Sequence, residues 1–161
     1  MRKYNSYRKA KYYIFRLLSL KDRSSEEIKG KLLSKGYNKE IVDQLISEFI
    51  KKGYINDEKF AYNFSKSRIF GKKYGRKLVE FELAKKGISK DVREKVIEDL
   101  YKNISEEELA RDLAEKKMKS YKDLPDEVKK RRLVGFLSRR GFSWEIIRKV
   151  FLEVFEEVDN S

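Results

Sequence analysis

The segment Gly71-Lys72-Lys73-Tyr74-Gly75-Arg76-Lys77 combines four cations, two glycines and an aromatic ring. It belongs to a stretch between Glu58 and Glu80 that contains no acidic residue, together with Lys66 and Arg68. Glycines leave backbone N–H groups exposed, and with the cations these groups suit phosphate oxygens. A tyrosine among them can stack on an unpaired base. The residues favour binding of nucleic acid or another polyanion; a solvated basic loop that only aids solubility is the alternative.

Two further basic stretches contain no acidic residue, one before Asp22 and one between Glu127 and Glu145. For the first, a basic tail and a specific contact are both open interpretations. For the second, Arg139 and Arg140 either bind a polyanion or complement the negative end of a helix that closes after them. The cations of the two stretches are Arg2, Lys3, Arg8, Lys9, Lys11, Arg16 and Lys21, and Lys129, Lys130, Arg131, Arg132, Arg139 and Arg140.

The chain of 161 residues has no histidine and no cysteine. Disulfides, thiolate chemistry and histidine-based triads are therefore excluded, and few zinc ligands remain. The acidic groups Asn56-Asp57-Glu58 and Ser105-Glu106-Glu107-Glu108 have the pattern of helix caps and lack the spacing of a calcium loop. We expect a protein that is not an enzyme, with no catalytic residue, metal ion or cofactor. A carboxylate-metal nuclease is the alternative, and it requires acidic residues that converge.

No stretch of the sequence approaches the roughly 20 apolar residues that cross a bilayer. The first residues, Met1-Arg2-Lys3-Tyr4-Asn5, lack the apolar segment of a secretory signal. We therefore expect a cytoplasmic protein without a membrane contact, and a monomer.

Positive charge is concentrated in the first two thirds of the chain. The formal net charge is +13. Residues 1–56 contain 14 Lys or Arg and 6 Asp or Glu, residues 57–104 contain 13 and 8, and residues 105–161 contain 13 and 13. An acidic polymer, most simply nucleic acid, is the expected partner of such a chain.

One pattern around a glycine occurs three times, with the glycines Gly36, Gly87 and Gly141 lying 51 and 54 residues apart. Apolar residues stand eight and four positions before each glycine and five and nine positions after it. Intervals of four keep such residues on one face of a helix, so each glycine separates two amphipathic helices. These apolar residues are Ile28, Leu32, Ile41 and Leu45, then Val79, Leu83, Val92 and Val96, then Leu133, Leu137, Ile146 and Val150.

The residues that follow each glycine explain the junction between the two helices. Glycine adopts the left-handed conformation that ends a helix without a Cβ penalty. An apolar residue comes next and can fold back on the helix just ended. The third residue has a side-chain oxygen that can cap the following helix. These pairs are Tyr37 and Asn38, Ile88 and Ser89, and Phe142 and Ser143.

A third helix opens each unit, marked by Ala10, Ala61 and Ala110. The third unit is five residues longer, and Pro125 lies in the extension, where proline favours a helix start. We expect an all-α protein of three tandem three-helix repeats at residues 7–56, 57–104 and 105–158, after a basic tail at residues 1–6. Stacked repeats of this kind form an elongated, curved row. Trp144, directly after the cap Ser143, is expected to be a packing anchor.

Several motifs, in the same order and at the same spacing, resemble the RecX family of bacterial regulatory proteins. Over residues 7–155 the resemblance rests on Arg68, the basic glycine loop and three motifs. The loop departs from the family pattern, because many relatives have Gly-Pro where this chain has Tyr74-Gly75. The motifs are Gly53-Tyr54-Ile55-Asn56-Asp57-Glu58-Lys59-Phe60-Ala61, Glu82-Leu83-Ala84-Lys85-Lys86-Gly87-Ile88 and Arg140-Gly141-Phe142-Ser143.

The resemblance implies a modulator of the RecA recombinase that lies in the groove of the RecA–single-stranded-DNA filament. Such proteins interfere with ATP hydrolysis, filament growth and strand exchange, and act in DNA repair, homologous recombination and the SOS response without a cofactor. Weaker, salt-sensitive binding to free single- or double-stranded DNA is also expected. We expect contacts from Lys66, Arg68, Lys72, Lys73, Tyr74, Arg76, Lys77, Arg131, Arg132, Arg139 and Arg140.

Two other functions are compatible with the same sequence. Tight helix–glycine–helix junctions resemble a helix-turn-helix, which predicts sequence-specific binding to duplex DNA without RecA. A helical-repeat scaffold for acidic proteins would use the basic stretches without touching nucleic acid. Gel shifts on duplex DNA, and crosslinking in nuclease-treated lysate, distinguish these two from a RecA modulator.

Overall fold

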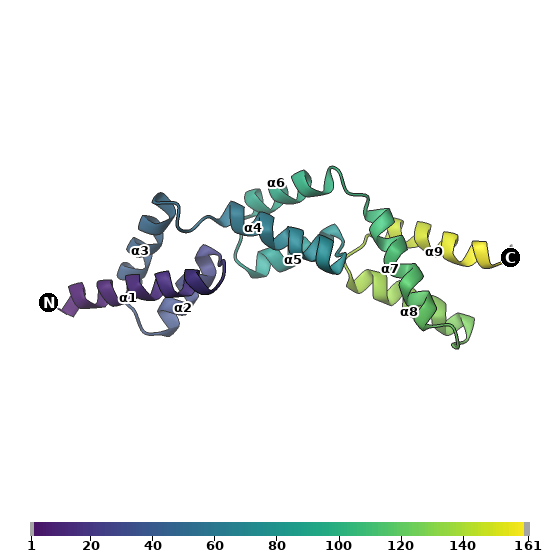
Figure 1. Ribbon diagram of the computed structural model, residues 1–161, viewed down its shortest axis with the longest axis horizontal. Coiled ribbons are helices and arrows are strands. Elements are labelled where there is room, and N and C mark those ends of the chain that lie inside the picture. Colours follow the sequence, from purple (N-terminus) through teal and green to yellow (C-terminus); the bar gives the residue numbers. More distant parts are fainter. Residues whose placement is uncertain (1, 160–161) are drawn as a thin grey trace. The chain divides into compact units, whose positions relative to one another are not determined.

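A computed structural model describes residues 2–159, with side chains over residues 5–155, and this part of the chain is entirely helical (Figure 1). The expected all-α fold of three three-helix repeats is confirmed. The first repeat contains α1 (Arg2–Leu20), α2 (Ser25–Ser34) and α3 (Lys39–Lys51). The second contains α4 (Asp57–Lys66), the π-helical turn η1 (Ser67–Gly71), α5 (Arg76–Lys85) and α6 (Lys90–Tyr101). The third contains α7 (Glu106–Ser120), α8 (Asp126–Arg139) and α9 (Trp144–Asp159).

The three repeat glycines have the left-handed conformation that the sequence predicts. Their φ angles are 84° at Gly36, 74° at Gly87 and 88° at Gly141. After each, the next N–H returns to a carbonyl five residues earlier, at 3.2 Å from Tyr37 to Leu32 in the first repeat. Gly53 adopts the same conformation, with φ 77°, and ends α3. We did not predict this fourth glycine turn, because it has no counterpart at the same position of the other repeats.

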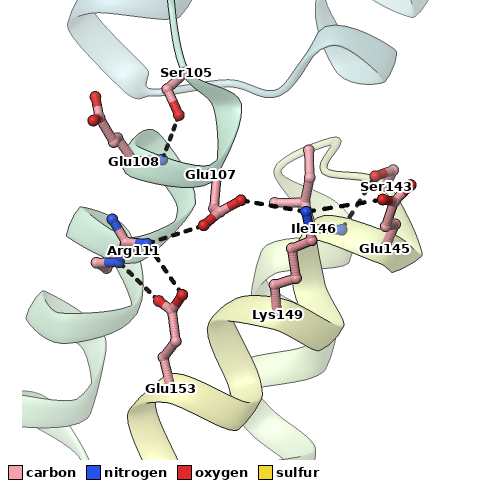
Figure 2. A network of polar contacts seen from close by, with 9 residues as sticks. All are labelled: Ser105, Glu107, Glu108, Arg111, Ser143, Glu145, Ile146, Lys149 and Glu153. Carbon is pink, nitrogen blue, oxygen red and sulfur yellow. Dashed lines mark hydrogen bonds and ion pairs between the residues drawn. The ribbon is translucent and has the colours of Figure 1, made fainter.

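Side-chain caps start several helices as expected. Asn38 accepts a hydrogen bond from the N–H of Glu40 at 2.8 Å, and Ser143 accepts one from Ile146 at 3.3 Å. Ser105 accepts one from Glu108 at 3.2 Å, at the start of α7 (Figure 2). The acidic residues around Ser105 therefore form a helix start, as their pattern predicts.

The helices pack into two compact units that do not follow the repeats. One unit contains the chain up to Asn63 together with Leu83–Arg93, and the other contains Phe64–Glu82 and the chain from Glu94 on. The division runs through the second repeat, which contributes helices to both units. Residues 2–6, which we expected to form a tail, are the first residues of α1.

The core of the first unit lies between α1, α2 and α3. The apolar residues predicted on either side of Gly36 all contribute to it, and Phe49 is fully buried beside them. Phe49 also contacts Phe15 and Tyr54, with ring centroids 4.9 and 5.5 Å away. The buried members are Ala10, Ile14, Ile28, Leu32, Ile41, Val42, Leu45, Phe49 and Ile55.

The core of the second unit lies between α7, α8 and α9, and a polar network holds α7 to α9 at its edge. In Figure 2, Arg111 of α7 donates to Glu153 of α9 at 2.8 Å and to Glu107 at 3.1 Å. The guanidinium lowers the pKa of the Glu153 carboxyl below its usual value. The buried apolar members of this core are Ala110, Ala114, Leu133, Leu137, Phe142, Ile147 and Val150.

The expected packing role of Trp144 is wrong, because its side chain is 66 % exposed at the start of α9. The core positions nearby are occupied by Phe142 and Ile147 instead. A position directly after a helix cap lies outside the apolar stripe, which begins at Ile146. Among the described residues, no helix is both long enough and apolar enough to cross a membrane.

The carboxylate of Glu48 generates a testable pH dependence in the first unit. It accepts hydrogen bonds from Lys11 at 2.9 Å, from Lys52 at 2.8 Å and from the hydroxyl of Tyr7. These donors lower the pKa of Glu48 to about 2. Because the folded pKa is depressed, the carboxylate stabilises the fold above its ordinary pKa of 4.5 and loses this effect as the pH falls towards 2.

We therefore expect Glu48→Gln to lower the melting temperature at pH 7. The difference from the wild type should shrink steadily as the pH falls from 4.5 to 2. Thermal unfolding followed by circular dichroism at each pH measures it. A difference that stays constant over this range would show that the charge of Glu48 does not contribute.

Candidate nucleic-acid interface

The basic loop of the second repeat is shorter than the sequence predicts. Only Lys73, Tyr74 and Gly75 are non-helical, because η1 continues to Gly71 and α5 begins at Arg76. The N–H of Lys73 donates to Ile69 at 2.9 Å and that of Tyr74 donates to Arg68 at 3.2 Å. Single π-helical turns occur frequently at functional sites. Here the turn ends α4 and fixes the direction in which the loop leaves it.

We call the turn at each repeat glycine, between the second and third helices of a repeat, a glycine corner. The loop is fixed against the glycine corner of the third repeat, at Gly141, within the second compact unit. The N–H of Gly75 donates to the carbonyl of Arg140 at 2.8 Å, and the N–H of Lys77 donates to that of Gly141 at 3.3 Å. A Cβ on Gly75 would lie 2.5 Å from the Gly141 oxygen, and a Cβ on Gly141 would lie 2.4 Å from the Cβ of Leu78. Both positions therefore require glycine because two backbones approach closely. We call this contact the Gly75–Gly141 joint.

A second joint of the same kind connects the first two repeats within the first compact unit. The hydroxyl of Ser24, which caps α2, donates to the carbonyl of Lys86 at 2.6 Å. Lys86 pairs with Glu27 at 2.7 Å, and a Cβ on Gly87 would lie 2.4 Å from the Cβ of Glu26. In both joints the glycine corner of the later repeat meets the start of the second helix in the earlier repeat.

The Gly75–Gly141 joint brings together cations that the sequence places 68 residues apart. Arg140 donates from Nη1 to the carbonyl of Lys72 at 2.8 Å. The Cζ of Arg140 and the Nζ of Lys72 lie 5.6 and 5.5 Å from the centroid of the Tyr74 ring. The Tyr74 side chain is half-buried, and the hydroxyl of Tyr101 donates a hydrogen bond to the backbone carbonyl of Tyr74 at 2.7 Å. Two cations thus lie close to the ring that we expected to stack on a base, so a base can stack there only if one of them moves.

Several of the predicted contact cations have carboxylate partners, Arg68, Arg76 and Lys73 among them. Arg68 pairs with Glu82 at 2.6 Å, and Arg76 pairs with Glu106 at 3.4 Å. Lys73 forms a close ion pair with Asp112 and lowers the pKa of that carboxyl. The acid-free stretch concealed these pairs, because Glu106 and Asp112 belong to the third repeat and Glu82 lies beyond the stretch. Charge counted along the sequence therefore overstates the positive field at the loop.

The remaining predicted contacts divide into two groups. Lys72, Lys77 and Arg139 are exposed close to the Gly75–Gly141 joint in sequence. Arg131 and Arg132 are exposed about two turns earlier in α8, and Lys66 is exposed at the end of α4. The described residues contain no group of three acidic side chains that could hold a metal ion.

The need for glycine at position 75 can be tested by comparison with a glycine that has no close neighbours. Gly75→Ala should lower the free energy of unfolding by about 1–3 kcal/mol, because the new methyl group overlaps the Gly141 carbonyl. Gly30→Ala is the control. This glycine is exposed within α2. Apart from its chain neighbours and the backbone of its own helix, no described atom lies within 4 Å of its Cβ position, and alanine should stabilise the helix by about 0.5–1 kcal/mol. Urea titrations measure both changes, and a Gly75→Ala protein as stable as the wild type would contradict the required close approach.

Comparison with known proteins identifies the repeats. Models of the first, second and third three-helix domains of RecX match residues 10–49, 56–97 and 105–151. The regulatory protein RecX of Chlorobium limicola is 32% identical over 152 residues, which cover 94% of this chain and 93% of that protein. The protein of the same name from Pelodictyon phaeoclathratiforme is 35% identical over 136 residues, or 84% of this chain and 82% of that protein.

A solved structure has the same fold over nearly the same length. The crystal structure of RecX from Lactobacillus salivarius superposes with a TM-score of 0.80 at 26% identity, over 92% of this chain and 96% of that one. Three observations lead to the same family: the three domain matches occur in order, each of them contains one glycine corner, and the two relatives are covered over most of their length. The chain belongs to the RecX family.

Proposed function

We propose that this protein binds in the groove of the RecA–single-stranded-DNA filament and modulates RecA, mainly by inhibiting ATP hydrolysis, filament growth and strand exchange. Membership of a family of regulatory proteins supports this function. In this proposal the protein acts in the cytoplasm as a monomer, without catalysis and without a cofactor. Its partners are the filament and, more weakly, free single- or double-stranded DNA.

The observation that carries the proposal is the set of cations at the Gly75–Gly141 joint. Lys72 and Lys77 are exposed there, and Arg140 is held beside them by its bond to the Lys72 carbonyl. A filament groove presents DNA phosphates and acidic protein surface, which attract such a group. The exposed pair of Lys73 with Asp112 opposes this only weakly, since surface ion pairs contribute little. Lys73 can therefore exchange Asp112 for a phosphate on binding.

The RecA ATPase tests this proposal directly. Adding the protein to RecA and single-stranded DNA should reduce the rate of ATP hydrolysis as the amount of protein approaches that of RecA. The double variant Lys72→Glu/Lys77→Glu should need much more protein for the same inhibition. Lys119→Glu/Lys122→Glu is the control, because it makes the same charge change at exposed positions of the third repeat. No inhibition by the wild type, or an equal loss in both variants, would contradict the proposal.

Binding to the filament should also weaken steeply as salt increases. Each phosphate contact that is lost reduces the slope of log K against log[salt] by about 0.7 on a single strand. We expect the Lys72→Glu/Lys77→Glu variant to have a shallower slope than the wild type. Filament binding measured by light scattering or anisotropy between low and physiological salt gives both slopes. Identical slopes would place the phosphate contacts elsewhere on the protein.

A further inference from the structure

A basic groove lies on the first repeat, away in sequence from the loop that the family resemblance singles out. It has a volume of about 620 Å³ and is lined by one face of α1 and by the corner that follows α2. The residues from α1 are spaced by one, three, one and three positions, which keeps them on one face of the helix. They are Arg8, Lys9, Tyr12, Tyr13 and Arg16, and the corner adds Lys35 and Tyr37.

The corner at Gly36 differs from the two corners that form joints. A Cβ at Gly87 or Gly141 would collide with the preceding repeat, whereas at Gly36 no described atom beyond the glycine and its chain neighbours lies within 4 Å of the Cβ position. Lys35 is exposed on one side of this glycine and Tyr37 is half-buried on the other. The first corner is therefore open to a ligand where the other two are covered by protein.

The lining of the groove contains cations and no carboxylate. Arg8, Lys9, Arg16 and Lys35 are exposed, and no carboxylate lines the groove. Among the described residues, none of these four cations lies in an ion pair with a carboxylate. This contrasts with the second repeat, where Arg68 pairs with an acid. Four cations without carboxylate partners favour a polyanionic ligand.

The tyrosines of the groove indicate which polyanion it is. Tyr12 is 73 % exposed on the same face as the cations, and Lys35 lies 4.3 Å from the centroid of the half-buried Tyr13 ring. An exposed ring between cations is the arrangement on which unpaired bases stack while their phosphates are neutralised. A duplex keeps its base faces covered, and an acidic peptide would leave Tyr12 unused. Unpaired bases use both features of the groove.

We propose that this groove on the first repeat binds single-stranded nucleic acid, with Arg8, Lys9 and Arg16 on the phosphates and Tyr12 stacked on a base. This deepens the proposed function by giving the chain its own contact with a single strand, separate from the Gly75–Gly141 joint. The contact does not require RecA, so it can be measured without the filament.

The test is fluorescence anisotropy of a labelled dT oligonucleotide of about 20 nucleotides, long enough to cover one groove, titrated with the full chain alone. Arg8→Glu/Arg16→Glu should weaken binding at least about tenfold, with a salt slope shallower by about 1.4 for two lost phosphate contacts. Tyr12→Ala should weaken binding roughly tenfold without changing the slope, and Tyr12→Phe should retain it. All of these side chains are exposed, so the fold should be unaffected, which thermal unfolding verifies.

The matched control is again Lys119→Glu/Lys122→Glu, which should bind like the wild type. Equal weakening by the control and by Arg8→Glu/Arg16→Glu would mean that only net charge matters. A loss confined to Lys72→Glu/Lys77→Glu would assign the single strand to the joint. Tyr12→Ala could also bind dT as tightly as the wild type, and polyglutamate could compete with the labelled dT as effectively as unlabelled dT does. These two results together would make the groove a surface for acidic proteins. Each of these results overturns the proposal.

The RecA ATPase separates this proposal from the proposed function. Groove variants that lose dT binding but still inhibit RecA would leave the filament proposal intact and support an independent single-strand site. Wild-type protein that binds dT through Tyr12 but leaves the ATPase unchanged would support the groove and contradict the filament proposal.

Discussion

The close approach of two backbones at Gly75 and Gly141 is the constraint on which the candidate interface depends. It places the amide of Gly75 on the Arg140 carbonyl, and this contact sets the position of Tyr74, Lys72 and Arg140. No side chain fits between the two segments, so the geometry of the basic cluster follows from the absence of two Cβ atoms. The cations are positioned by the joint itself, and a change in the joint would displace all of them together.

The sequence predicted the helices well because their signals are local. Apolar spacing around Gly36 and Gly141, the caps Asn38 and Ser143, and the left-handed glycines each depend on a few neighbouring residues. The joints could not be predicted in the same way, because they connect residues 59 or more positions apart. One signal was available in the sequence. Gly75 lies twelve residues before Gly87, and Ser24 lies twelve residues before Gly36. Only the structure shows that both positions receive a glycine corner.

The charge around the candidate site could not be predicted from the sequence for an electrostatic reason. An acid-free stretch of sequence carries no information on acids that folding brings to it, and Asp112 and Glu106 arrive from α7. In contrast, the stretch before Asp22, which we left open between a tail and a contact, forms a helix whose exposed face is lined by cations and tyrosines. Net charge predicts an acidic polymer as the partner, whereas the location of the cations without carboxylate partners required the fold.

The joints also determine which repeat can receive the glycine corner of a following repeat. Each joint uses two parts, a glycine corner and a helix start twelve residues before the next glycine, and the first two copies carry such a start at Ser24 and Gly75. In the third copy, however, the equivalent of Ser24 and Gly75 is Lys129, which lies inside α8 because that helix begins at Asp126 after Pro125. A fourth corner would meet the side of a helix there instead of its start. The third repeat therefore lacks, at this position, the helix start that receives a glycine corner in the first two repeats.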